Sequence, residues 1–546
     1  MPAPHDASAA QDGSRRFTEY RGFLPFARRA SAREVRALWA ERATRGPRPV
    51  WMHVHVPYCP QICSFCHCGK LLLTQPAQLD AWLARAEDEA RFFSPALRGA
   101  HVQNLYLGGG TPNLLSPKQL ERLMVALRGA FDFAPEGRRT LEVLPSAYRD
   151  GTLAVAAAHG INRLSAGVQS SERALLDGVG RAPDLARLEV ILREAAALGV
   201  DDVNVDLAWR LQGDTEARFF RSVADVLDLG PSTVSVHLLA PTAAHPVYAS
   251  VADEREVYRQ FRGFAEGEGA RALARSHPEY VWRALPTVMT LARRDYVDAG
   301  RYFTWQYSDM ETVEMDMFAL GRFGLSHLLG AARYENASPV SEFNPDAPAY
   351  RVTRVDGATD GAMDALSHLI RDGRCEPETL RRFYGDDVDE LRAKLDALCA
   401  EGTLRREGEV YRTDRDPGSL GMGPLSALFS AAEQRARELN AGDDGPPRLI
   451  PMRDRRPRAP APSVTLDVGG AAMAVFVERV VPGRDYCRET RGLGMFYASD
   501  GGAPRSAVHD ALERLRDALT AEAERGADDL QDLCARTTRA LAQHGE

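Results

Sequence analysis

The sequence predicts an α/β protein built on a partial (β/α)6 barrel, with a small winged-helix-like module and an extra α+β segment at its C-terminal end. Two observations lead to this fold class. Between Val50 and about Pro241, short β-rich runs alternate with segments whose apolar residues recur at helical spacing. From about Asp360 to Thr413 the pattern changes to two helices and a charged turn. Strand–helix repetition predicts a parallel sheet, and six strands are too few for a closed eightfold barrel.

The elements of the barrel follow one another at regular intervals. The runs predicted as strands are Val50–Val56, His101–Leu107, Thr140–Leu144, Arg163–Val168, Val203–Leu207 and Thr233–Leu238. The helices predicted between them are Gln78–Phe93, Pro117–Phe131, Asp184–Leu198 and Thr215–Asp228. In such folds the ligands bind at the carboxyl ends of the strands, so we expect the functional residues there.

The chain outside the barrel divides into smaller parts. Helices centred on Ala362–Ile370 and Val388–Cys399, with a β-like run at Glu409–Arg412, predict the winged-helix-like module. Frequent acidic residues favour a packing role for it over DNA binding. We divide the chain into a tail with a lead-in helix (1–49), the barrel (50–345), the module as a substrate cover (346–445), a linker (446–462) and a C-terminal segment (463–546). The C-terminal segment combines a β-rich piece (Ser463–Arg479) with a helix (Ser506 to about Arg525), and it has no assigned role.

Composition and charge exclude several functional classes. The net charge of −8 argues against attraction to nucleic acid or an anionic membrane, because both need a basic face. No stretch approaches the roughly 18 apolar residues of a membrane span. Residues Met1–Arg16 lack the charged-then-apolar order of a secretory signal and are interpreted as a disordered tail. We therefore expect a cytoplasmic protein, active as a monomer, without membrane or nucleic-acid partners.

Four cysteines crowd into ten residues directly after the first predicted strand, at Cys59, Cys63, Cys66 and Cys68. In a reducing compartment such a crowd indicates a metal or redox site rather than disulfides. Thiolates at C-x3-C-x2-C spacing can bind three irons of a 4Fe–4S cubane and leave the fourth open to a small molecule. The open iron distinguishes a catalytic cluster from an electron-transfer cluster.

Two other interpretations of the cysteines compete with the cluster. Cys59, Cys63 and Cys66 could form a closed zinc site with His67 or Cys68. Structural zinc sites usually join two paired knuckles, and no second pair follows here. Unliganded buried thiols are the other alternative, which four cysteines so close together disfavour.

The cysteine loop resembles a known superfamily. The C-x3-C-x2-C spacing, with Phe65 before the third cysteine, is the signature of the radical S-adenosylmethionine (SAM) enzymes. The string His55-Val56-Pro57-Tyr58-Cys59 through Cys66-His67-Cys68 resembles the oxygen-independent coproporphyrinogen III oxidase family, which includes haem chaperones and class C methyltransferases. The additional cysteine at Cys68 resembles the oxidases more than the chaperones.

Collinear motifs extend the resemblance from about Trp51 to Asn336. They are Leu105-Tyr106-Leu107-Gly108-Gly109-Gly110-Thr111-Pro112, Leu141-Glu142-Val143, Ile161 through Ser170 with Arg181 after it, Asn204-Val205-Asp206-Leu207, and more weakly Asp316–Gly321 and Arg333–Asn336. The cysteine motif is specific. The later motifs support the resemblance because they occur in the same order as in the family. A lone Gly-Gly-Gly would indicate only a strand-to-helix turn.

The resemblance implies a role for each motif. Cys59, Cys63 and Cys66 would hold the cluster, with Tyr58, Phe65, Cys68 and Thr111 beside the cofactors. Backbone at Gly108, Gly109 and Gly110 can approach SAM closely, because these residues have no side chain. Glu142 and Arg181 would hold the polar end of SAM, while Gln169 and Asp206 would hold its ribose. For Glu142 and Asp206 the competing interpretation is a solvated charge or a helix cap.

The implied reaction needs a 4Fe–4S cluster, one or two SAM molecules and a one-electron donor such as flavodoxin or ferredoxin. The reduced cluster would cleave SAM to a 5′-deoxyadenosyl radical, which would abstract hydrogen from a small-molecule substrate. His53, His55, His67 and Tyr58 could tune the cluster or handle protons, although a structural role for each histidine is as well supported.

This chain departs from the oxidases at His53, at Leu211-Gln212-Gly213 and over residues 298–304, regions expected near SAM or substrate. We therefore expect another small-molecule substrate, one of secondary metabolism. The alternatives are coproporphyrinogen III decarboxylation, class C methyl transfer, a non-catalytic haem chaperone, and a zinc-stabilised regulatory protein that uses its module on DNA.

Overall fold

The computed structural model describes residues 28–238, 263–301 and 315–413, apart from gaps at 45, 47–48, 64, 67–68, 183, 210, 212, 285–287 and 300. It also describes residues 428, 435–436 and 438–440, and the strands at 463–468, 471–477 and 493–494. The predicted tail at Met1–Arg16, the linker and the helix at Ser506–Arg525 lie outside the described residues.

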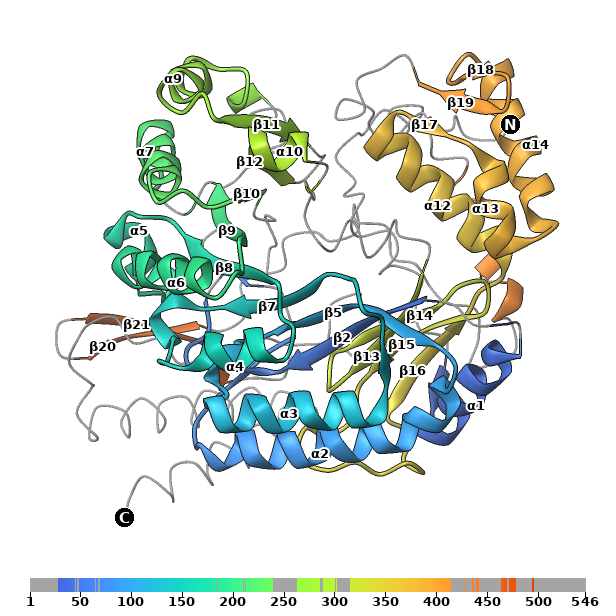
Figure 1. Cartoon of the computed structure of the whole chain (residues 1–546), viewed down its shortest axis with the longest axis horizontal. Helices are drawn as coiled ribbons and strands as arrows, with labels where there is room; N and C mark the ends of the chain where they lie inside the picture. Colours follow the sequence, from blue (N-terminus) through green and yellow to red (C-terminus); the bar gives the residue numbers. More distant parts are fainter. Residues whose placement is uncertain are drawn as a thin grey trace.

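A large curved sheet organises the chain (Figure 1). Its centre is a run of parallel strands that follow one another in chain order. These strands are β2 (Pro49–Val56), β5 (His101–Gly109), β7 (Arg139–Val143), β8 (Arg163–Gln169), β9 (Asp202–Trp209) and β10 (Thr233–Leu238). Each matches a run predicted from the sequence, so the predicted fold class is confirmed. Their carboxyl ends meet at one edge, because parallel strands all point the same way.

The sheet continues at both ends of the parallel run. Next to β2 lies the parallel strand β13 (Asp316–Leu320), followed by antiparallel β14 (Leu325–Leu328), β15 (Ala332–Asn336), β16 (Tyr350–Arg354) and β1 (Arg28–Ala30). Next to β10 lie β12 (Val288–Arg293) and β11 (Tyr280–Ala284), and β6 (Asp132–Phe133) pairs with β5. The sheet thus continues past residue 345, where the sequence-based division ended the barrel.

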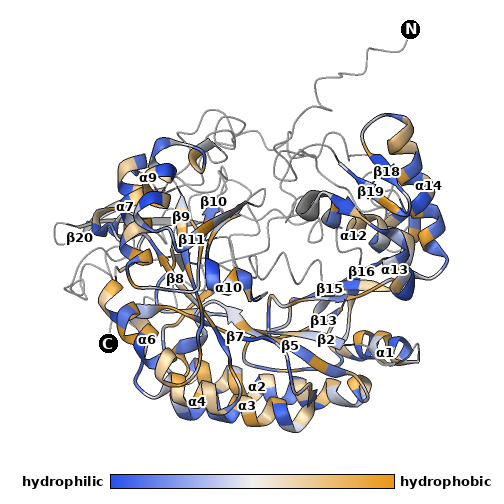
Figure 2. Cartoon of the chain, turned by 45° about the horizontal axis from the view of Figure 1, so that its top comes forward, coloured by the Kyte–Doolittle hydropathy of each residue, from blue (hydrophilic) through white to orange (hydrophobic). Residues whose placement is uncertain are grey.

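Helices cover the convex side of the sheet (Figure 1). They include α1 (Ala32–Ala43), α2 (Ala77–Phe93), α3 (Pro117–Ala130), α4 (Thr152–Ala158), α5 (Arg173–Asp177), α6 (Leu185–Ala197) and α7 (Glu216–Leu227), with α9 (Glu268–Ser276) and α10 (Arg294–Asp298) near β11 and β12. Local sequence sets their ends: α3 begins at Pro117 after a capping box between Ser116 and Gln119. Figure 2 shows hydrophobic and hydrophilic residues on α2, α3 and α4, as expected for helices with one buried face.

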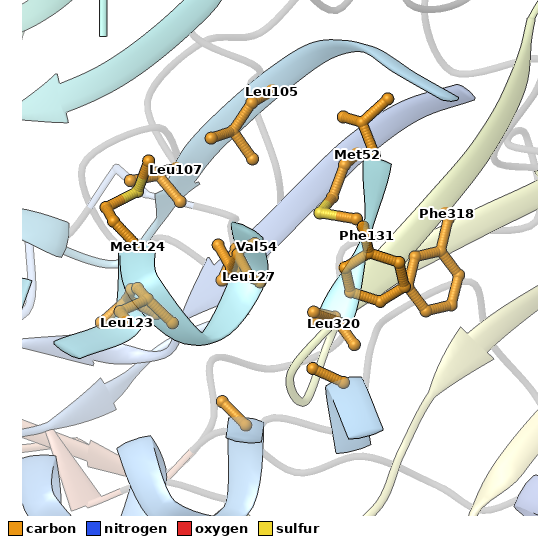
Figure 3. Close-up of a cluster of buried hydrophobic side chains, with 14 of the residues drawn as sticks. Met52, Val54, Leu105, Leu107, Leu123, Met124, Leu127, Phe131, Phe318 and Leu320 are labelled. Atoms are coloured by element: carbon orange, nitrogen blue, oxygen red, sulfur yellow. The ribbon is translucent and has the colours of Figure 1, made fainter. Parts of the chain in front are cut away.

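Apolar side chains of the sheet point toward these helices. Figure 3 shows Met52 and Val54 of β2 and Leu105 and Leu107 of β5 facing residues of α3, among them Leu127. All are buried, and burial of each such side chain stabilises the fold by about 1.5–3 kcal/mol. Side chains alternate along a strand, so the residues between them point to the concave face. Those residues are largely polar, which makes the concave face the place for a site.

A buried polar network joins α2 to the antiparallel part of the sheet. The Glu89 carboxylate accepts hydrogen bonds from Arg85 at 2.6 Å, Tyr350 at 2.7 Å and Asn336 at 2.6 Å, and from the backbone N–H of Gly321 at 2.9 Å. Both Glu89 and Arg85 are fully enclosed. Because the charges are paired and hydrogen-bonded, the network fixes how β13–β16 lie against α2.

The module consists of α12 (Gly357–Asp372), α13 (Pro377–Tyr384) and α14 (Asp387–Ala400) with a sheet of β17 (Arg374–Cys375), β18 (Arg405–Glu407) and β19 (Val410–Arg412). The side chain of Asp360 is one of its contacts with the barrel. Asp360 of α12 is bonded to His327 at 2.7 Å, Arg333 at 2.8 Å and the N–H of Gly330 at 2.7 Å.

Within the described part of the chain, no helix combines the length and apolar character needed to cross a membrane.

We expect Asp360→Asn to destabilise the protein by about 3–5 kcal/mol at neutral pH, because His327 and Arg333 would lose their buried counter-charge. Thermal or urea unfolding measures the loss. Asp389→Asn is the matched control: Asp389 pairs with Arg381 on the surface of the same module, so its loss should leave the stability nearly unchanged.

The effect of Asp360→Asn should depend on pH. Burial alone raises the pKa of Asp360, but the charges of His327 and Arg333 outweigh it and hold the pKa well below its usual range. A carboxyl with a depressed folded-state pKa contributes its stability above the unfolded pKa of about 4, and loses it as the pH falls below that value. The gap between wild type and variant should therefore narrow as the pH falls below about 4. A gap that stays constant down to about pH 2 would contradict this assignment.

Candidate functional site

The predicted site residues gather at the carboxyl edge of the parallel strands. Strand register aligns Val56 of β2 with Gly109 of β5, and Gly167 of β8 with Asp206 of β9. The cysteine loop follows β2 at this edge. The motifs from four strands that the sequence analysis singled out are therefore neighbours in space, although they span about 150 residues of sequence.

The cysteine loop is anchored by backbone bonds and by side chains around it. The N–H of Leu73 donates to the carbonyl of Cys59 at 2.8 Å, and Lys70 Nζ donates to the carbonyl of Cys66 at 2.6 Å. His55 Nε2 lies 2.8 Å from the carbonyl oxygen of Gly69. These bonds fix the backbone on both sides of the thiols.

Two aromatic side chains clamp the same loop. Phe65 packs on a buried apolar cluster formed by Leu175, Leu176, Val179, Ala208 and Leu211. Phe323, in the turn after β13, presses on Gly69, where any Cβ atom would overlap its ring. Phe323 has a φ of +70°, a strained backbone for a non-glycine residue. The strain is tolerated at the place where this ring touches the cysteine loop.

Cys59, Cys63 and Cys66 are half-buried thiols. Burial raises the pKa of the Cys59 thiol to about 12, and the nearby Cys66 thiol adds to this rise. Burial also raises the pKa of Cys63, whereas Arg181, with Nη1 3.7 Å from the Cys63 sulfur, opposes the rise. Thiolates in this environment need added positive charge, which an iron–sulfur cluster provides.

The donor set has the sulfur chemistry that a cubane requires. Among the described residues, no group of three or more His, Cys, Asp or Glu side chains comes together around one ion position. A cubane binds each thiolate to a different iron, so its ligands do not converge on one point. Sulfur is also the ligand type that these clusters take. His67 and Cys68, the partners proposed for a zinc site, lie outside the described residues.

Gly109, the last residue of β5, and Gly110 after it have separate roles. A Cβ atom on Gly110 would come within 2.5 Å of the Tyr58 carbonyl oxygen, so this glycine lets β5 touch the cysteine loop. Gly110 also donates its N–H to Val56 at 2.7 Å. Gly109 has a φ of +110° and lies against the ring of His55. The next residue, Thr111, is buried and hydrogen-bonds to Cys59.

Glu142 lies at the centre of the concave face. The Tyr106 hydroxyl donates to Oε1, and the N–H of Gly109 donates to Oε2 at 2.9 Å. Burial raises the pKa of Glu142 to about 7, while the hydrogen bond from Tyr106 opposes the rise. Asp206 and Cys66 are close enough to raise it further. A partner with positive charge at this position would therefore favour the ionised form.

Asp206 belongs to a hydrogen-bonded group on β8, β9 and β10. Its Oδ1 accepts from Asn204 at 2.7 Å and lies 3.1 Å from His237 Nε2, and its Oδ2 accepts from Ser165 at 3.0 Å. Burial raises the pKa of Asp206, but the bond and charge of His237 outweigh burial and leave the pKa below its usual value. The carboxylate is thus held ionised and in a fixed orientation.

Gln169 and Arg181 approach each other at the end of β8. Gln169 has a φ of +74°, next to an irregularity in the pairing of β8 with β9. A Cβ atom on Gly167 would lie 2.9 Å from an Arg181 nitrogen and 3.3 Å from the Gln169 amide. Arg181 donates to the Gly167 carbonyl, so its guanidinium extends from Gly167 to Cys63.

Four side chains of the site were not among the residues assigned from the sequence: Tyr106, Ser165, Asn204 and His237. Each of the four lies either an even number of residues along the same strand from an assigned residue, or on the strand next to an assigned residue. The period-two alternation of strands could have indicated Tyr106 from Gly108 and Asn204 from Asp206. Nothing in the sequence indicates which partner each would contact.

Comparison with known proteins agrees with this geometry. Residues 53–226 match the family model described as the Radical SAM superfamily. Over these residues the chain therefore resembles the radical SAM domains, a class of domain that uses a 4Fe–4S cluster and SAM.

Within this class the chain resembles the oxygen-independent coproporphyrinogen III oxidases. It is 34% identical to that enzyme from Salmonella typhimurium over 201 residues, which are 37% of this chain and 44% of the relative. It is 31% identical to the heme chaperone HemW of Lactococcus lactis over 193 residues, 35% of this chain and 49% of the relative. The match thus spans less than half the length of these relatives.

The fold extends the likeness beyond the matched sequence. The structure of coproporphyrinogen III oxidase (HemN) from Escherichia coli superposes with a TM-score of 0.58. The alignment covers 72% of this chain and 93% of that structure at 21% identity. At this identity the likeness concerns the fold alone.

We expect Cys59→Ala, Cys63→Ala and Cys66→Ala each to lose most of the iron and sulfide of the reconstituted protein, because the cubane loses a ligand. Iron and acid-labile sulfide analysis measures this. Cys375→Ala, at a buried cysteine in the module, and Cys68→Ala should both keep the cluster. Equal iron loss in Cys68→Ala would overturn the assignment of the three ligands.

Gly110→Ala should also reduce cluster content, because the added methyl group forces the Tyr58 backbone and the cysteine loop apart. Gly129→Ala is its matched control, since a Cβ atom there meets nothing within 4 Å and alanine favours the helix by about 1 kcal/mol. Iron content and thermal unfolding of both variants test the contact. Normal iron content in Gly110→Ala would show that the loop does not depend on it.

Proposed function

We propose that this protein is a radical SAM enzyme that abstracts hydrogen from a small-molecule substrate. The observation that supports this most directly is the set of half-buried thiols at the carboxyl edge, with Glu142, Arg181 and Asp206 around them. In the proposal, Cys59, Cys63 and Cys66 hold the cluster. The bound cluster and SAM would supply one-electron cleavage of SAM, which begins the hydrogen abstraction.

The surrounding residues would bind and orient SAM. Glu142 offers a carboxylate to the SAM amino group, and Arg181 offers its guanidinium to the SAM carboxylate. Asp206, held ionised by its neighbours, offers oxygen acceptors to the ribose hydroxyls, with Gln169 beside it. Phe65 and Phe323 exclude water from the sides of the loop. The proposed site holds one or two SAM molecules.

The substrate and the partners are proposed on chemical grounds. The polar concave face suits a small molecule with several hydrogen-bonding groups. The electron would come from a protein such as flavodoxin or ferredoxin. We also propose that the enzyme acts in the cytoplasm as a monomer. Decarboxylation of coproporphyrinogen III is one alternative reaction, because the relatives include the oxidases. Class C methyl transfer is the other alternative.

The module is proposed to cover the site rather than to bind DNA. Its arginines form ion pairs with acidic residues of the same module: Arg381 with Glu378 and Asp389, and Arg392 with Glu409. A DNA-binding surface would need such cations to face phosphates instead.

A haem chaperone is the second candidate function, because HemW proteins are among the relatives that this chain resembles. Titration with haem, followed by absorbance, distinguishes it. Tight stoichiometric binding would favour the chaperone, whereas weak, non-saturating binding would favour the enzyme.

The direct test is mass spectrometry of the products after anaerobic reconstitution with iron and sulfide, followed by SAM and a strong reductant. We expect 5′-deoxyadenosine and methionine. S-adenosylhomocysteine in addition would favour methyl transfer. If the cluster-loaded protein forms neither product and also binds haem tightly, the enzyme proposal is overturned.

A further inference from the structure

Tyr106 and Glu142 form a pair across the neighbouring strands β5 and β7. The Tyr106 hydroxyl donates to one carboxylate oxygen of Glu142, and the N–H of Gly109 donates to the other at 2.9 Å. Tyr106 is only 4% exposed, so its hydroxyl is shielded from bulk water. Both oxygens of Glu142 therefore have a fixed donor, and the plane of the carboxylate is set by the sheet.

The first glycine of the motif makes room for this pair. A Cβ atom on Gly108 would overlap the Tyr106 ring and lie 2.9 Å from Glu142 Oε2. On its other side the Tyr106 ring meets the edge of the His53 ring, with centroids 5.7 Å apart. Gly108 and His53 thus confine the tyrosine to the position from which it reaches Glu142.

A carboxylate that binds an ammonium group must present its remaining lone pairs in one direction. Free rotation of the Glu142 side chain would spread them over several directions and weaken the contact. We propose that Tyr106 is a positioning residue for SAM: it holds Glu142 so that the carboxylate accepts the amino group of the SAM methionine moiety. This inference rests on the proposed function, and specifically on Glu142 as the partner of that amino group.

The test is SAM binding without turnover. Labelled SAM is dialysed to equilibrium against anaerobically reconstituted, unreduced protein: wild type, Tyr106→Phe, Glu142→Gln and the double variant. Tyr106→Phe should weaken binding roughly tenfold, as expected for a lost hydrogen bond to a charged group. The double variant should bind no more weakly than Glu142→Gln alone, because Tyr106 acts through Glu142.

Tyr148→Phe is the matched control. The Tyr148 hydroxyl donates to Glu194 at 2.5 Å, and Tyr148 packs in the core between the sheet and the helices. Its variant loses a Tyr–Glu bond of the same chemistry and should bind SAM like the wild type. Iron content and thermal unfolding establish that each variant is folded and loaded.

Two results would overturn the inference: Tyr106→Phe with wild-type affinity, or a double variant whose loss equals the sum of the single losses. Should Tyr106→Phe fail to load its cluster, Glu142→Asp tests the same contact from the other side, because the shorter acid keeps its charge but withdraws from the tyrosine. Wild-type affinity in Glu142→Asp would also overturn the inference. Wild-type protein that is loaded but binds no SAM would instead contradict the proposed function.

Discussion

The contact between β2 and β5 is the constraint on which the site depends. The N–H of Gly110 donates to the Val56 carbonyl at 2.7 Å, and the Cα of Gly110, which carries no side chain, lies against the carbonyl of Tyr58. The cysteine loop begins at this seam, so its direction is set by how closely β5 can approach. A side chain at Gly110 would separate the loop from the strand that carries Glu142's backbone donor, Gly109.

The two faces of the sheet differ in polarity and in role. The convex face is apolar and packs under α2 and α3, which provides most of the stabilisation of the barrel. The concave face is polar, and its charges are paired where they are buried: Glu142 with Tyr106, and Asp206 with Ser165, Asn204 and His237. A polar interior is costly unless its groups are bonded. These bonds also orient the side chains that the proposed chemistry needs.

Strand β13 and the antiparallel strands β14–β16 contribute to the site from beyond β2. They place Phe323 on the cysteine loop, through a backbone held in a strained conformation. The buried network around Glu89 keeps these strands against α2, and Asp360 connects them to the module. The module and the cysteine loop are therefore linked through one part of the sheet.

The sequence by itself determined the parallel strands, the main helices, the cysteine loop and most of the residues at the carboxyl edge. It could do so because hydrophobic periodicity and motif spacing are local properties of the chain. The tertiary structure alone decided that the sheet continues into β13–β16, that Phe323 presses on Gly69, and that Tyr106 and His237 hold the two carboxylates. These are contacts between segments tens to hundreds of residues apart, and the spacing of residues along one segment carries no information about them. Gly108 illustrates the division, because its place in a glycine motif is visible in the sequence, whereas the Tyr106–Glu142 pair that needs the space is visible only in the fold.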